Sequence, residues 1–216
     1  MAELVFFCGT MDSGKATLAL QTAHNHESRG RKGLIFTRND RAGEGKISSR
    51  LGMAINAIEV TDETNFHAEV LRRVGYGERV DFLICDEAQF YSRNQVDELA
   101  TIVDSLEIDV FTFGILTDFR TLLFPGSARL IELADRVNVL QVEALCWCGE
   151  RATHQARIVN GQMVVEGEQV VVGDTDHDVV AYEVLCRRHH MRQVTSRMSH
   201  DYFAADAALP FGQLDS

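Results

Sequence analysis

The stretch GTMDSGKATLAL, which runs from Gly9 to Leu20, decides the fold. Its first seven residues fit the pattern G-x-x-x-x-G-K, in which backbone N–H groups and a lysine surround phosphate oxygens. The apolar run Leu4–Cys8 precedes it, and apolar residues at helical spacing follow it. A strand that leads through a glycine loop into a helix is the context this pattern requires. The competing interpretation is an ordinary strand-to-helix turn with a solvated lysine.

One position departs from the pattern, because Ala16 stands where Ser or Thr normally offers a hydroxyl to Mg²⁺. Thr17 lies about 100° further around the helix, so it should not simply substitute. Backbone contacts and Lys15 survive the change, so we expect nucleotide binding to remain while magnesium placement weakens. Losing one such contact in a transition state costs about 1.5–4 kcal/mol, or roughly tenfold to nearly a thousandfold in rate.

Apolar strands alternate with helical patterns through the first two thirds of the chain. Strands are predicted over residues 4–8, 33–37, 80–90 and 109–119, and helices over 14–30, 94–106 and 127–137. The polar, glycine-containing stretch 38–52 is interpreted as a mobile loop over a site. This alternation predicts an α/β fold, with a parallel P-loop sheet that carries helices on both faces.

Composition narrows the class of protein. The chain has 216 residues, of which 45% are hydrophobic and two are proline, so a real core is expected. A net charge of −11 argues against a nucleic-acid binder or an anionic-membrane binder. No apolar run approaches the roughly 20 residues of a membrane span, and the N-terminus lacks the pattern of a secretory signal. We therefore expect a cytoplasmic protein whose five cysteines serve as thiols or metal ligands.

The stretch CDEAQF places Asp86 and Glu87 at the end of an apolar strand. The carboxyl ends of parallel strands are where ligands bind in such folds. Asp86 is predicted to hold Mg²⁺, directly or through water, and Glu87 to accept a proton from an attacking hydroxyl. Solvated acids at a strand end are the alternative, which the neighbouring phosphate loop makes less attractive.

C-x-C and C-x-x-H pairs predict a structural zinc site. Its ligands are expected to be Cys146, Cys148, Cys186 and His189. His190 competes with His189 for the fourth place, His154 is a distant candidate, and unrelated buried cysteines remain the alternative. Cys8 and Cys85 lie within apolar strands and are expected to be small buried hydrophobes.

The segments after about residue 145 are short and β-like, with a hairpin predicted around Glu166 and Gly167. We therefore predict a nucleotide-binding domain over residues 1–142, a zinc-binding lobe over 143–192, and a disordered tail over 193–216.

The motifs GTMDSGK, DEAQF, CWC and YEVLCRRHH, in this order, resemble those of cytosolic thymidine kinases of the zinc-containing P-loop type. The resemblance spans roughly residues 3–190, and the C-x-C and C-x-x-H combination resembles a bacterial branch. It implies transfer of the ATP γ-phosphate to the 5′-hydroxyl of thymidine in nucleotide salvage, with Mg²⁺ and structural Zn²⁺, and leaves the preference over deoxyuridine open. It also implies a homotetramer that thymidine triphosphate inhibits, and a substrate-holding segment within the zinc-binding lobe of residues 143–192.

The resemblance assigns roles to matching residues. ATP and its magnesium ion are contacted by Gly9, Thr10, Met11, Asp12, Ser13, Gly14, Lys15, Ala16, Thr17, Asp86 and Gln89. The catalytic residues are Glu87 as general base, Lys15 and Arg41. The nucleoside is contacted by Met11, Phe90, Phe119, Val170, Val172, Gly173 and Tyr182. Without the family pattern, Phe90 and Phe119 would be interpreted as core aromatics and Tyr182 as a surface strand residue.

Three alternatives stay open at this point. The first is a P-loop hydrolase that couples ATP to motion, which the aromatic-lined zinc lobe argues against. The second is a sensor that binds nucleotide and nucleoside but lost catalysis at Ala16. The third is a zinc-ribbon nucleic-acid module, which the charge of −11 disfavours.

Overall fold

The structure is a computed structural model that describes residues 1–38, 45–49, 52–169 and 180–199. The chain divides into two compact units. The larger comprises Met1–Asp118 and Leu122–Glu143, and the smaller comprises Phe119–Thr121 together with the chain from Ala144. Within the described ranges, no helix is both long and apolar enough to cross a membrane.

The larger unit is built on a six-stranded sheet with the order β5-β2-β6-β7-β1-β8. Every strand pair in it is parallel, as the alternation of strands and helices predicts. The strands are β1 Leu4–Cys8, β2 Gly33–Thr37, β5 Ile58–Glu59, β6 Phe82–Cys85, β7 Asp109–Gly114 and β8 Arg136–Val139. Their carboxyl ends therefore share one edge, which carries the phosphate loop after β1 and the acidic pair after β6.

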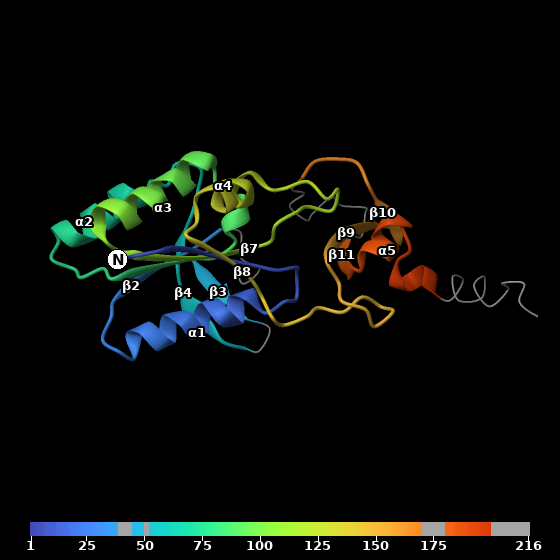
Figure 1. The fold of residues 1–216 in the computed structure, drawn as a ribbon, viewed down its shortest axis with the longest axis horizontal. Helices are drawn as coiled ribbons and strands as arrows, with labels where there is room; N and C mark the ends of the chain where they lie inside the picture. The colour runs from blue at the N-terminus through green and yellow to red at the C-terminus, as the bar shows by residue number, and fades with distance from the viewer. Residues whose placement is uncertain (39–44, 50–51, 170–179, 200–216) are drawn as a thin grey trace, which may run out of the picture. The chain divides into compact units, whose positions relative to one another are not determined.

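Helices cover both faces of this sheet, as Figure 1 shows. Helix α1 (Lys15–Glu27) lies on one face, near the small antiparallel pair β3 (Lys46–Ser48) and β4 (Ala54–Asn56). The opposite face carries α2 (Phe66–Gly75), α3 (Arg93–Leu106) and α4 (Pro125–Leu133). Two clusters of buried apolar side chains, one on each face, form the core.

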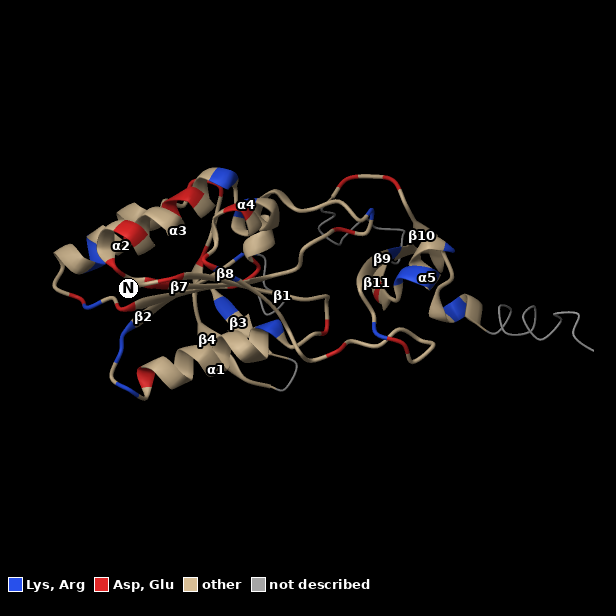
Figure 2. Ribbon diagram, in the orientation of Figure 1, with Lys and Arg blue, Asp and Glu red and all other residues tan. Residues whose placement is uncertain are grey.

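Local sequence explains where these helices begin. The Ser92 side chain accepts a hydrogen bond from the Gln95 N–H, and the Gln95 side chain accepts one from the Ser92 N–H, which is a complete capping box for α3. Asn65 caps α2 in the same manner through the Ala68 N–H. Figure 2 shows acidic and basic residues interspersed along α2 and α3, where ion pairs such as Arg73–Glu69 form on the exposed side.

Some boundaries differ from the prediction. Helix α2 was not predicted, although Phe66 and Val70 are fully buried at helical spacing. The helix predicted to reach residue 137 ends at Leu133, because Arg136–Val139 instead pair in parallel with β1. The strand predicted over 109–119 ends at Gly114. Strand β3 lies inside the stretch predicted to be a loop.

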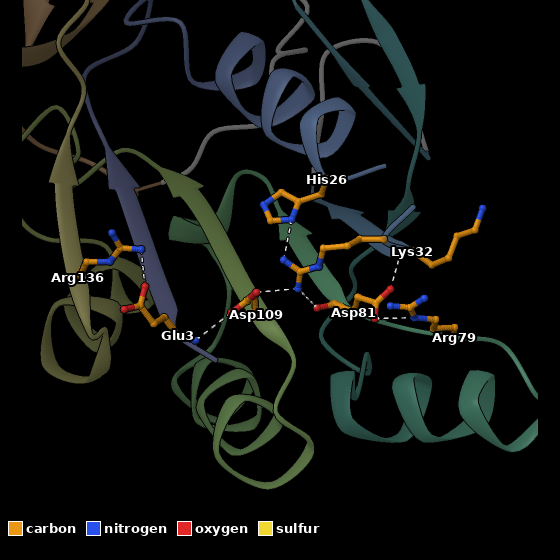
Figure 3. Close-up of polar contacts among 8 residues, drawn as sticks. Glu3, His26, Lys32, Arg79, Asp81, Asp109 and Arg136 are labelled. Atoms are coloured by element: carbon orange, nitrogen blue, oxygen red, sulfur yellow. Dashed lines mark hydrogen bonds and ion pairs between the residues drawn. The ribbon is translucent and has the colours of Figure 1, made fainter. Parts of the chain in front are cut away.

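A network of polar contacts joins the opposite, amino-terminal ends of the central strands (Figure 3). The Arg31 guanidinium contacts the His26 ring nitrogen at 2.8 Å and the Asp109 carboxylate at 2.7 Å, and donates to the Asp81 carbonyl at 2.6 Å. Asp109 also accepts from the Glu3 backbone N–H at 3.2 Å. These contacts link the end of α1 to the starts of β1, β6 and β7.

The smaller unit contains a three-stranded antiparallel sheet with the order β10-β9-β11. Its strands are β9 His154–Val159, β10 Gln162–Val164 and β11 Val180–Leu185, followed by the short helix α5 Arg187–Met191. The hairpin predicted around Glu166 and Gly167 extends into residues 170–173, which lie outside the described residues, so it stays a prediction. Asn160 and Gly161, at φ values of 52° and 84°, turn β9 into β10, because an Asn-Gly pair adopts this left-handed geometry readily.

The first residues of the predicted tail, as far as Ser199, have a described structure. Val194 and Thr195 are buried, and the Trp147 indole N–H donates to the Val194 carbonyl at 3.1 Å. Ser196–Met198 form one turn of 3-10 helix. The start of the segment assigned to the tail from residue 193 therefore packs against the smaller unit.

Candidate phosphotransfer and zinc sites

The phosphate loop lies between β1 and α1, as predicted. Asp12 and Gly14 have φ values of 65° and 80°, and a Cβ on Gly9 would lie 2.3 Å from the Ser13 hydroxyl oxygen. The loop therefore needs its glycines to turn this tightly. Gly14 precedes α1 without any side-chain cap, which leaves the first N–H groups of a 13-residue helix to a phosphate.

Lys15 is the first residue of α1 and is 9% exposed. Its ammonium group donates to the Thr10 carbonyl at 2.7 Å, and the Ser13 hydroxyl donates to the same carbonyl at 2.8 Å. The lysine is thus held against the loop it serves. Ala16 is partly buried and packs against the apolar cluster under α1, and Thr17 follows it on the helix.

The acidic pair follows β6 at the same edge of the sheet. Asp86 is 2% exposed, and its backbone N–H donates to the Phe36 carbonyl at 2.9 Å. Thr37, which follows Phe36, is fully buried and its hydroxyl has no hydrogen-bond partner among the described residues. A buried carboxylate next to such a hydroxyl is an oxygen-rich position that fits Mg²⁺ and its waters.

Glu87 has a left-handed backbone, with φ 52°, at the start of the 3-10 turn η1 (Ala88–Phe90). Its carboxylate accepts a 2.5 Å hydrogen bond from the Gln89 amide nitrogen. The Gln89 amide oxygen in turn accepts from the Ile115 backbone N–H at 3.2 Å. Gln89 is 1% exposed, so a buried side chain fixes Glu87 relative to the end of β7. Sequence analysis gave Gln89 only a nucleotide contact and missed this role.

Aromatic residues and glycines pack around η1. Phe90 is partly buried and meets Phe124 edge-to-face with ring centroids 5.5 Å apart. A Cβ on Gly126 would lie 2.4 Å from the Ala88 carbonyl oxygen, so α4 approaches η1 as closely as a glycine permits. Met11 lies in the phosphate loop, and its predicted contact with the nucleoside stays a prediction.

The four predicted metal ligands come together in the smaller unit. The ligand atoms of Cys146, Cys148, Cys186 and His189 all lie within 4.8 Å of one another. His189 Nδ1 lies 3.4 Å from the sulfurs of both Cys146 and Cys186, a spacing that suits tetrahedral zinc. Trp147 stacks on the His189 ring with centroids 4.0 Å apart.

The alternative fourth ligands are settled by geometry. The His190 Nε2 lies 3.0 Å from the Phe119 carbonyl oxygen instead of joining the sulfurs, and the His154 ring lies tilted against the His190 ring with centroids 5.0 Å apart. Cys8 and Cys85 are fully buried, and burial raises the pKa of both thiols, which agrees with their prediction as small hydrophobes.

The predicted nucleoside contacts fall in several places. Phe119 belongs to the smaller unit and is 2% exposed, while Tyr182 lies on β11 and is 42% exposed. Arg157, which sequence analysis missed, contacts both of them. The remaining predicted residues lie outside the described residues: Arg41, Val170, Val172 and Gly173.

Comparison with known proteins supplies the family. Residues 2–190 match the family model described as thymidine kinase. A thymidine kinase of Streptomyces avermitilis is 60% identical over 212 residues, which cover 97% of this chain and 98% of that protein. One of Streptomyces coelicolor has the same identity and coverage, and one of Cutibacterium acnes is 53% identical over 98% of both chains.

The chain belongs to the thymidine kinase family.

The resemblance to bacterial thymidine kinases is thereby confirmed, and the motor protein and the zinc-ribbon module are set aside. Nothing in these comparisons favours the sensor. Among solved structures, a Pif1 helicase from Candida albicans shares 15% identity with a TM-score of 0.38, over 64% of this chain and 36% of that one. This likeness is too low to bear on the fold or the function.

Proposed function

We propose that this thymidine kinase transfers the γ-phosphoryl group of ATP to the 5′-hydroxyl of thymidine, in nucleotide salvage. The observation that carries the proposal is the edge of the larger sheet. There, the uncapped start of α1 follows the phosphate loop, and Asp86 and Glu87 follow β6. A phosphate cradle and a carboxylate pair at one sheet edge are what phosphoryl transfer to a hydroxyl requires.

Each residue has a role that its surroundings support. The backbone of residues 9–14 and the Lys15 ammonium hold the phosphates of ATP, which Lys15 reaches from the first turn of α1. Asp86 holds the magnesium ion or its waters from a nearly buried position. When bound, the magnesium ion and ATP supply charge neutralisation and the transferred group.

Glu87 takes the proton of the 5′-hydroxyl as that oxygen attacks phosphorus. The hydrogen bond from Gln89 fixes the direction of the carboxylate. Because Gln89 is itself tied to the Ile115 N–H, the base is oriented before substrate binds. Arg41 is proposed to assist this step.

The smaller unit is proposed to serve the nucleoside. Three thiolates and one imidazole fit a structural Zn²⁺ with no open position. Strand β11 of its sheet carries Tyr182. The neighbouring strand β9 carries Arg157, which contacts the Phe119 ring. The other proposed nucleoside contacts are Met11, Phe90, Val170, Val172 and Gly173.

Further properties follow from the family resemblance and are proposed on that ground. They are a cytoplasmic location, assembly into a homotetramer and inhibition by thymidine triphosphate. Deoxyuridine is proposed as a second acceptor. A rate that stays the same when thymidine triphosphate is added would contradict the proposed inhibition.

The test is transfer of label from γ-labelled ATP in the presence of Mg²⁺. We expect label on the 5′-oxygen of thymidine and none with 5′-deoxythymidine, which has the same base and sugar but no acceptor. Phosphate release that does not depend on thymidine would indicate a hydrolase. Binding of both ligands without transfer would indicate the sensor.

A further inference from the structure

Arg157, on β9 of the smaller unit, is a buried cation that belongs to none of the sequence motifs described above. The residue is 4% exposed. Its Nε donates to the Tyr182 hydroxyl at 3.1 Å. Its two terminal nitrogens donate to the carbonyls of Glu168 at 2.9 Å and Gln169 at 3.0 Å. One guanidinium thus ties β9 to β11 and to the residues that directly precede Val170.

The same guanidinium also stacks on an aromatic ring. Its central carbon lies 3.9 Å from the centroid of the Phe119 ring, within the range of a strong cation–π contact. Tyr182 stands directly opposite Arg157 in the antiparallel register, so the two side chains are cross-strand neighbours. On its backbone side, Phe119 is held by the His190 ring through the Phe119 carbonyl.

Burying the Arg157 guanidinium in this way lowers the stability of the fold, which suggests a role in function. Among the described residues, no carboxylate pairs with Arg157, so carbonyl dipoles, a hydroxyl and a ring face replace its water. Burying a charge without an opposite charge is among the least favourable choices for stability alone. Lysine could not make these contacts, because only the flat, forked guanidinium donates in three directions while stacking.

We propose that Arg157 is a positioning residue for nucleoside binding. It fixes the Phe119 ring and the Tyr182 hydroxyl relative to each other, and anchors the backbone just before Val170 through the carbonyls of Glu168 and Gln169. The proposal rests on the proposed function, in which Phe119, Tyr182 and the following residues contact thymidine. Arg157 acts through them and does not itself touch the reacting atoms.

A positioning role on the nucleoside side predicts a selective effect. The phosphate loop and the acidic pair belong to the larger unit, whereas Arg157 and the residues that it contacts belong to the smaller one. Loss of the guanidinium should therefore weaken thymidine binding and leave ATP binding and the zinc content unchanged. A residue needed only for folding would change all of them together.

The test compares Arg157→Met, which keeps an apolar stem of similar length, with Arg157→Lys, which keeps the charge. We expect the Met variant to raise the KM for thymidine about tenfold to a hundredfold, the scale of losing hydrogen bonds from a charged group. The Lys variant should recover only part of this loss. The KM for ATP and the zinc content, measured by atomic absorption, should match those of the wild type.

A double-mutant cycle with Tyr182→Phe removes one accepting hydroxyl while leaving the ring. If Arg157 acts partly through Tyr182, the double variant should be weaker by clearly less than the product of the two single effects. If Arg157→Met loses zinc, Arg157→Lys takes its place in the same cycle.

Either of two results would overturn the proposal. One is an unchanged KM for thymidine in a zinc-loaded Arg157 variant. The other is a double variant whose loss of thymidine binding equals the product of the losses in the Arg157 and Tyr182 single variants. Calorimetric titration of thymidine distinguishes failure of this positioning role from failure of the proposed function. A wild type that binds thymidine but transfers no phosphate would refute the kinase assignment, and the titration would still measure the contribution of Arg157.

Discussion

At the scale of single residues, two side chains bear most directly on the chemistry at the edge of the larger sheet. The Gln89 amide makes two hydrogen bonds inside the protein: its nitrogen donates to the Glu87 carboxylate, and its oxygen accepts from the Ile115 N–H. Ala16 lacks the hydroxyl that this position normally gives to Mg²⁺, while the loop and Lys15 around it are formed. The proposed base is thus held by two hydrogen bonds in series, while the proposed magnesium position lacks one of its usual oxygen ligands.

Ala16→Ser should raise kcat because it restores one oxygen ligand at the first turn of α1. We expect a gain of about tenfold to several hundredfold, together with a lower Mg²⁺ concentration for half-maximal rate. Steady-state rates over a magnesium titration measure both quantities. Thr17→Ala is the neighbouring control and should change the KM for ATP without changing the magnesium requirement. If Ala16→Ser leaves rate and magnesium dependence unchanged, the missing-ligand interpretation is wrong.

At the scale of elements, the proposed base follows from how closely α4 packs against η1, the turn that begins next to Glu87. A Cβ at Gly126 would come within 2.4 Å of the Ala88 carbonyl oxygen, 2.8 Å of that of Tyr91 and 2.9 Å of that of Gln89. These are backbone atoms of the turn that carries Gln89 and Phe90, and backbone cannot yield as the tip of a side chain can. One helix therefore sets the position of the turn next to Glu87.

Gly126→Ala should destabilise the larger unit by about 1–3 kcal/mol, as overpacking does, and should also lower kcat because η1 moves. Gly75→Ala is the matched control, since a Cβ there meets nothing within 4 Å at the end of α2. That control should keep full activity and gain slightly in stability. Urea unfolding and steady-state kinetics measure both effects. Equal behaviour of the two variants would show that close packing at Gly126 is unimportant.

The network at the amino ends of the strands predicts an acid-sensitive element. Burial and then the Arg31 guanidinium lower the pKa of His26 below 6.5, against an opposing effect of Asp109. A histidine with a lower pKa when folded takes up protons preferentially on unfolding, so the free energy of unfolding falls as pH drops below about 6.5. The rings of Phe82 and Phe111 pack against the half-buried His26 ring, with centroids 4.9 and 5.0 Å from its own.

His26→Gln, which cannot titrate, should make the free energy of unfolding fall less between pH 7.5 and 5.5 than in the wild type. Arg31→Gln should lower stability at both pH values and retain part of the slope, because burial is the larger cause. Urea unfolding at the two pH values gives the comparison. A wild-type slope in His26→Gln would show that another group controls this range.

At the scale of the whole molecule, the two units differ in the apolar cores that their described residues form. The larger unit has an extensive core on both faces of its sheet. Among its described residues, the smaller unit has one small apolar cluster, made mostly of alanines and cysteines. A metal ion bound by the cluster of three cysteines and one histidine would add a cross-link to this small core.

Removal of zinc with a chelator should therefore unfold the smaller unit and abolish thymidine binding, while the larger unit still binds ATP. Zinc sites of this kind supply about 10–16 kcal/mol in small peptides, well above what such a cluster offers. Cys148→Ser should lose zinc and thymidine binding, and Cys8→Ala, a cysteine in the other unit, should keep both. Calorimetry with each ligand measures the outcome. Thymidine binding that survives without zinc would contradict the cross-linking role.

The parallel sheet, the phosphate loop, the acidic pair and the cluster of three cysteines and one histidine could be predicted from the sequence, because each rests on local spacing or on a strand end. Helix α2 and the hairpin that joins β9 to β10 were missed, although the buried Phe66 and Val70 and the Asn160–Gly161 pair carried the signals. Sequence reasoning could not find Arg157, since a lone arginine in a strand looks like a surface residue. Only the tertiary packing brings Phe119, 38 residues away in the chain, onto its guanidinium.

The most direct test of the account is the effect of Glu87→Gln on thymidine phosphorylation, since Glu87 is proposed as the base. We expect kcat to fall by about 10²–10⁴-fold, with calorimetric affinities for ATP and thymidine close to those of the wild type. Glu63→Gln, at an exposed acid, should retain full activity. A Glu87→Gln variant that keeps a wild-type kcat while binding both substrates normally would contradict the account, because the proton would then leave by another route.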